Sequence, residues 1–87
     1  MYNPGSGPRI FPNPFRDRLN VTFTDRVDQN VKFELFDASG RLVYEEEAWV
    51  DDVWTSREVF QVTQGIYFFS IKIGDQDEEV YPVMGGF

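Results

Sequence analysis

The fold of this sequence is constrained most by short runs in which apolar and polar residues alternate, with turn-forming residues between the runs. Such period-two alternation is typical of β-strands with one buried face, and helical periodicity is hard to find anywhere in the chain. The sequence therefore predicts an all-β fold, an immunoglobulin-like antiparallel β-sandwich of about seven short strands. The expected strands cover residues 9–11, 18–24, 31–36, 41–50, 54–62, 66–73 and 79–84.

The alternation also predicts which side chains form the core and which strands lie at the edges. The strand over 66–73 is the most apolar and should be central, whereas acidic residues 45–47 mark 41–50 as an exposed edge. Pro82 cannot donate a ladder hydrogen bond, so the last strand should lie at an edge or bulge. The side chains expected to point inward are Leu19, Val21, Phe23, Val31, Phe33, Leu35, Tyr67, Phe69, Ile71 and Ile73.

Length and composition predict one small folded domain. At 87 residues, such a chain buries roughly 60 to 65% of the surface that its unfolded form exposes. Nine phenylalanines supply a large apolar content for that core and argue against disorder. We expect residues 1–8 to be a flexible lead-in and residues 9–87 to be a single β-sandwich domain, cut from a longer protein.

Charge and hydropathy exclude several classes of partner. The net charge of −7 makes attraction to nucleic acid or anionic lipid unfavourable. No apolar run approaches the roughly 20 residues that span a bilayer, and the first 20 residues lack a secretory signal pattern. We therefore expect a soluble domain with no membrane insertion and no nucleic-acid partner.

The inventory of reactive side chains argues against catalysis. The chain has neither histidine nor cysteine, so it lacks the commonest general base, the strongest nucleophile and the usual zinc ligands. Its carboxylates cluster in expected turns and at outward strand positions, where burial should not raise their pKa values. The sequence predicts that the protein is not an enzyme and carries no cofactor.

Two other features favour binding, but each has a plainer interpretation. Acidic stretches 49–54 and 74–79 offer oxygen ligands for calcium, with Asp75, Asp77 and Glu79 alternating, although a solvated hairpin tip explains them equally well. Exposed aromatic rings could stack on sugars or form a partner surface. We expect instead that they complete a thin core or pack on a missing parent domain; the rings concerned are Phe36, Trp49, Trp54, Phe60 and Phe68.

Three short motifs lie between the expected strands or at their ends. The first is "IFPNPFRDRL", residues 10–19, in which two prolines should hold the intervening asparagine extended and take the chain out of the sheet. The second is "FDASGR", residues 36–41, in which an aspartate can cap its own turn and a glycine supplies positive φ. The third is "VTQGIY", residues 62–67, which leads into the central strand with a glycine to relieve turn strain and a tyrosine ring with a polar tip.

Taken in order, these motifs make residues 9–84 resemble the C-terminal sorting domain of proteins exported by the bacterial type IX secretion system. Pro12, Asn13 and Pro14 match the opening of that family's pattern. Asp37, Gly40 and Arg41 match its hairpin turn. Gly65, Ile66 and Tyr67 match the start of its long apolar strand, with Val62 standing where the family often has leucine.

The resemblance implies a signal carried by a cargo protein. In this family the domain follows an N-terminal cargo domain and directs it through the outer-membrane translocon to the surface or exterior of a Gram-negative bacterium. A surface peptidase often removes the domain while the cargo is joined to a lipopolysaccharide anchor. The implied recognition strand is the last one, here Val80, Tyr81, Pro82, Val83 and Met84, and an exposed last strand could also pair weakly with a second copy.

The end of the sequence departs from the family pattern. "EEVYPVMGGF", residues 78–87, has two acidic residues, a proline and a Gly-Gly tail where the family has a lysine-bearing final strand. This departure leaves an alternative open: a non-catalytic immunoglobulin-like accessory module that binds carbohydrate, calcium or a neighbouring domain.

Overall fold

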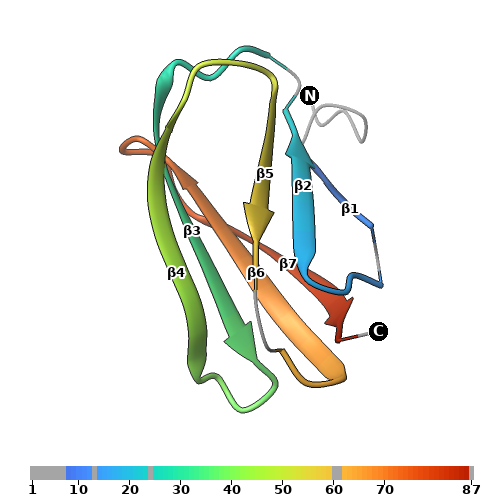
Figure 1. Ribbon diagram of the computed structural model, residues 1–87. Helices are drawn as coiled ribbons and strands as arrows, with labels where there is room; N and C mark the ends of the chain where they lie inside the picture. Colours follow the sequence, from blue (N-terminus) through green and yellow to red (C-terminus); the bar gives the residue numbers. More distant parts are fainter. Residues whose placement is uncertain (1–7, 13, 24, 60–61, 87) are drawn as a thin grey trace, which may run out of the picture.

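The protein forms two antiparallel sheets that pack face to face as a β-sandwich (Figure 1). The computed structural model describes residues 8–12, 14–23, 25–59 and 62–86. The smaller sheet has the strand order β1-β2-β5 and the larger the order β4-β3-β6-β7. The strands are β1 (Arg9–Phe11), β2 (Arg18–Thr22), β3 (Gln29–Asp37), β4 (Leu42–Val50), β5 (Trp54–Glu58), β6 (Gly65–Ile73) and β7 (Glu79–Gly85).

The alternating pattern forms the sandwich because each strand turns one row of apolar side chains toward the facing sheet. Phe33 and Phe69, from neighbouring strands of the larger sheet, stack with their ring centroids 5.9 Å apart. The buried apolar core consists of Phe15, Leu19, Val21, Val31, Phe33, Leu35, Val50, Val59, Tyr67, Phe69, Ile71 and Val83. The expected inward-facing residues thus form most of the core, and Phe23 and Ile73 are partly buried against it.

The arrangement of the strands also follows the expectations, with small differences in length. β6 is an inner strand of the larger sheet, β4 and β7 are its edges, and Pro82 lies on the edge strand β7. The strand expected over 54–62 ends at Glu58, because its partner β2 begins at Arg18, which pairs with Glu58. Thr24, expected to end the second strand, lies outside the described residues, and β2 ends at Thr22.

Three of the spare aromatic rings do not complete the core, so packing on a neighbouring domain stays the prediction for them. Trp49 is 62% exposed and Trp54 is 52% exposed, and Phe68 is also exposed. Each occupies an outward position of its strand, because its neighbours along the chain take the inward ones. Phe36 is half-buried, and Phe60 lies outside the described residues.

A polar cluster that the sequence did not indicate joins the two sheets. The guanidinium of Arg57, on β5, lies over the Phe33 ring at 5.4 Å from its centroid and forms an ion pair with Glu46 of β4 at 3.2 Å. Tyr44 donates a hydrogen bond to the other carboxylate oxygen of Glu46 at 2.5 Å. Burial, and then the Glu46 carboxylate, raise the pKa of Tyr44 well above its usual range.

The part of the chain that the structure describes has no helix long and apolar enough to span a membrane.

Candidate functional site

The three sequence motifs converge at one end of the sandwich, which we call the motif end. It comprises the connection from β1 to β2, the turn from β3 to β4, the connection from β5 to β6 and the end of β7 (Figure 1). The antiparallel registers place them together: Asp37 pairs with Tyr67, and Gly65 pairs with Gly85. Segments that lie far apart in the sequence therefore form one surface.

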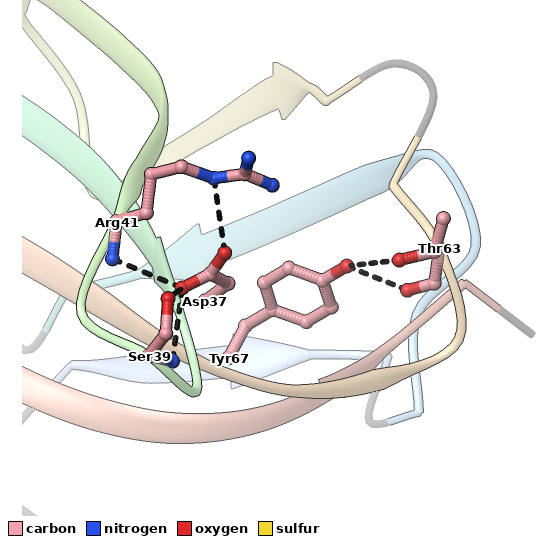
Figure 2. Close-up of polar contacts among 5 residues, drawn as sticks. All are labelled: Asp37, Ser39, Arg41, Thr63 and Tyr67. Atoms are coloured by element: carbon pink, nitrogen blue, oxygen red, sulfur yellow. Dashed lines mark hydrogen bonds and ion pairs between the residues drawn. The ribbon is translucent and has the colours of Figure 1, made fainter.

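The turn between β3 and β4 is organised by the carboxylate of Asp37 (Figure 2). One oxygen accepts hydrogen bonds from the Ser39 hydroxyl at 2.6 Å, the Ser39 backbone N–H at 3.0 Å and the Arg41 backbone N–H at 2.9 Å. The other lies 3.2 Å from the Arg41 guanidinium. The Ser39 hydroxyl and the Arg41 backbone N–H together hold the pKa of Asp37 below its usual value. Gly40 has φ +90°, as the turn requires.

Tyr67, near the start of β6, closes the connection from β5 to β6 (Figure 2). Its ring is buried, and its hydroxyl donates a hydrogen bond to the Thr63 carbonyl at 2.6 Å. A tyrosine in the sixth strand that bonds back to the backbone a few residues upstream is the tyrosine corner of immunoglobulin-like domains.

The other residues of the third motif lie in different surroundings. Val62 packs against the core, whereas Ile66 is 54% exposed. Gly65 does not have positive φ, so the expectation that it relieves turn strain is wrong.

The proline motif carries the chain from the smaller sheet to the edge of the larger one. Pro12 follows β1 and is joined to Phe11 by a cis peptide bond, and Pro14 is exposed; Asn13 lies outside the described residues. Immediately afterwards, Phe15 is fully buried, and its backbone N–H donates to the Met84 carbonyl of β7 at 2.7 Å. Its ring meets the Tyr67 ring edge-on at 6.1 Å. The expectation that the chain leaves the sheet here is confirmed.

Close contacts explain the two glycines of the unusual tail. A Cβ atom on Gly85 would clash with the Phe15 ring. A Cβ atom on Gly86, which has φ +82°, would lie 2.5 Å from the backbone of Thr63 and Gln64. Both glycines therefore allow the tail to pack closely against the motif end. Phe15 was not among the residues expected in the core, although it directly follows the prolines of the first motif.

The expected recognition strand presents only some of its residues to solvent. Val80, Pro82 and Met84 are exposed, whereas Val83 is buried and Tyr81 is partly buried against the core. The strand is hydrogen-bonded to β6 on one side and forms the edge of the sheet on the other. Any partner that contacts the outer face of β7 would therefore meet Val80, Pro82 and Met84.

The acidic stretches form no metal site among the residues that the structure describes. No group of three or more carboxylates there could hold a metal ion. Glu78 instead accepts a hydrogen bond from buried Ser70 at 2.8 Å, and Glu79 accepts one from the Tyr81 hydroxyl. Asp75 and Asp77 lie in the connection between β6 and β7, and Glu79 begins β7.

Comparison with protein families decides the identity of the chain. The family described as "Secretion system C-terminal sorting domain" matches residues 9–81, which include all three motifs. The chain belongs to this family. The resemblance drawn from the sequence is thus confirmed, and the match ends within β7, just before the unusual tail.

A solved structure shows the same architecture for the sorting domain. A DUF3244 family protein with an immunoglobulin-like β-sandwich fold from Bacteroides vulgatus has a TM-score of 0.70 and 15% sequence identity. The alignment covers 88% of the sorting domain and 82% of that protein, which confirms the fold. No curated protein sequence is significantly similar to the sorting domain.

Proposed function

We propose that this domain is a non-catalytic sorting signal that directs a cargo protein through the outer-membrane translocon of the type IX system. The cargo would be the N-terminal part of the same polypeptide and would reach the surface or exterior of a Gram-negative bacterium. A surface peptidase would then remove the domain, and the cargo would be anchored. The observation that carries the proposal is the family match over residues 9–81.

The geometry of the motif end supports this role. Phe15, in the first motif, fixes the end of β7 through its contacts with Met84 and Gly85. The buried and hydrogen-bonded motif residues therefore support the fold, whereas the exposed residues of β7 are available to a receptor. The tail takes part in this packing through Gly85 and Gly86.

Export of a reporter tests the proposal. A periplasm-targeted reporter would be fused to the whole domain, to the domain without residues 79–87, and to the domain with residues 80–84 replaced by polar residues. In a type IX-competent host, the whole domain should deliver the reporter to the surface or medium, and both altered forms should leave it in the periplasm. Periplasmic retention of the intact fusion, with the domain folded, would overturn the proposal.

Two exposed tryptophans favour a second candidate function, carbohydrate binding. Trp49 and Trp54 flank the connection from β4 to β5, at the opposite end from the motifs. Exposed rings of this kind can stack on sugar rings. Affinity electrophoresis in polysaccharide gels should then show retardation that Trp49→Thr and Trp54→Thr each reduce; unretarded migration of the intact domain would exclude this function for the polysaccharides used.

A further inference from the structure

An apolar patch crosses the outer face of the larger sheet next to the motif end. One row of cross-strand partners contains Leu42, Phe36, Phe68 and Pro82, one from each strand, and the next row pairs Ile66 with Met84. Partners in register project from the same face. We call these six residues the outer apolar patch.

The outer apolar patch is open to solvent. Ile66 is 54% exposed, Met84 is 46% exposed, and Leu42, Phe68 and Pro82 are also exposed; Phe36 is half-buried. Contiguous exposed apolar side chains on a small domain often mark an interaction site, because isolated exposed residues are ordinary but clusters are not. The patch includes two of the exposed residues of β7 and extends the surface around them across the whole sheet.

Carboxylates border the outer apolar patch on the side away from the motif end. The next row of cross-strand partners contains Glu45, Glu34, Ser70 and Val80. Ser70 holds the Glu78 carboxylate beside this row through a 2.8 Å hydrogen bond. Glu45 forms an ion pair with Lys32 at 3.6 Å, and Lys32 pairs across the strands with Lys72. The negative charge that a partner meets along this border therefore comes mainly from Glu34 and Glu78.

The size and charge of this surface indicate which kind of partner it could bind. A stable interface uses roughly 20 to 30 residues on each side, so six side chains suit a transient contact with a partner rather than a stable homodimer. The acidic border and the net charge of −7 oppose anionic membranes. A protein with an apolar surface bordered by lysine or arginine would complement both features.

We propose that the outer apolar patch is the docking face for the secretion-machinery protein that recognises this domain, and that this protein presents an apolar surface with a basic border. This inference rests on the sorting function proposed above. It differs from recognition of the last strand alone, because Leu42, Phe36, Phe68 and Ile66 belong to other strands.

The reporter fusion with the full domain tests the inference with two kinds of variant. Ile66→Thr with Phe68→Thr removes apolar surface, and threonine suits an outward strand position. Phe11→Thr with Val53→Thr is the control, because it removes exposed apolar side chains outside the patch. We expect the patch variant to lower the exported fraction at least tenfold and this control to export like the unaltered fusion, with thermal unfolding confirming that each domain is folded.

Charge reversal gives a test that does not depend on the apolar substitutions. Glu34→Lys should lower export, whereas Asp25→Lys makes the same change in net charge elsewhere and should leave export unchanged. Equal export by both charge variants would overturn the inference that the partner has a basic border. Normal export by the folded patch variant would overturn the inference that the patch is a docking face.

Three results separate this inference from its alternatives. Retention of the unaltered fusion in the periplasm contradicts the sorting function itself, whereas export of both the unaltered and patch-variant fusions contradicts only the docking face. Sedimentation of the purified domain identifies a second copy as the occupant if the unaltered domain dimerises and the patch variant does not. That outcome would also overturn the inference.

Discussion

Gly85 shows how a single residue adapts the unusual tail to this fold. The fully buried ring of Phe15 occupies the space that a side chain at position 85 would need. Gly65, its cross-strand partner, has nothing within 4 Å of where its Cβ would lie. The two paired glycines thus differ in their surroundings, and only Gly85 is required by packing.

Gly85→Ala should therefore destabilise the domain by about 1 to 3 kcal/mol, the usual range for adding a methyl group to a packed core. Urea unfolding followed by tryptophan fluorescence measures the change. Gly65→Ala is the matched control and should leave stability within about 1 kcal/mol or raise it slightly. Phe15→Leu combined with Gly85→Ala should cost less than the sum of the two single changes, and strict additivity would contradict the proposed clash.

Asp37 makes the β3–β4 turn sensitive to pH. Its pKa is lowered in the folded protein, first by the Ser39 hydroxyl and then by the Arg41 backbone N–H. The stabilisation that comes from a lowered carboxyl pKa is present above the unfolded-state pKa, which is about 3.9, and is lost as the pH falls through the folded-state value. Asp37→Asn should therefore be less stable than the unaltered domain at pH 7, and the difference should shrink as the pH falls below about 4.

Thermal melts of both proteins between pH 7 and pH 2.5 provide the measurement. Asp25→Asn serves as the control, because Asp25 is exposed in the connection from β2 to β3. A constant difference between Asp37→Asn and the unaltered domain across this range would show that the charge of Asp37 does not stabilise the turn.

At the scale of the element, β7 is an edge strand with two features that protect it. Pro82 pairs with Phe68 but has no N–H, so its nitrogen must face the free edge of the sheet. Two residues further on, the Met84 carbonyl also faces away from β6 and accepts the hydrogen bond from Phe15. A second strand approaching this edge would therefore find a missing donor and an occupied acceptor, which limits pairing with another copy.

Pro82→Val should restore a donor to the free edge and increase self-association. Valine suits an outward strand position, so the fold should persist while a concentration-dependent dimer becomes detectable by analytical ultracentrifugation. Val80→Thr, which alters the same face without adding a backbone donor, is the control and should sediment like the unaltered domain. An unchanged sedimentation profile for Pro82→Val would mean that the proline is not what protects the edge.

The elements themselves were largely predictable, because each depends on local alternation and turn chemistry. Asp37 and Gly40 specify their hairpin within a few residues of sequence, and Tyr67 carries both its apolar ring and its polar tip. The contacts that build the motif end were less predictable. Phe15 meets Gly85 across 70 positions of sequence, and nothing local to either residue indicates the other. Whether the tryptophans complete the core or face outward was also not predictable, because composition does not reveal which face of a strand remains uncovered.

At the scale of the whole molecule, the two sheets are joined differently at their two sides. On the side of β1 and β7, the Phe15 backbone hydrogen bond links the smaller sheet to the larger one. On the side of β4 and β5, the link is the Arg57 cluster, in which the guanidinium also donates to the Thr55 hydroxyl at 3.0 Å. The second link uses side chains alone and is therefore open to substitution without disturbing a strand.

Arg57→Ala should lower the free energy of unfolding by about 1 to 3 kcal/mol, because it removes both the buried stem and the charge stacked on Phe33. Arg57→Met should recover part of this loss, since methionine replaces the stem but not the charge. Arg18→Ala is the control: Arg18 forms its ion pair with Glu58 at the exposed face of the smaller sheet, where such pairs contribute less than about 1 kcal/mol. Urea denaturation of the three variants provides the measurement. If Arg57→Ala cost no more than Arg18→Ala, the cluster would be a surface pair rather than a link between the sheets.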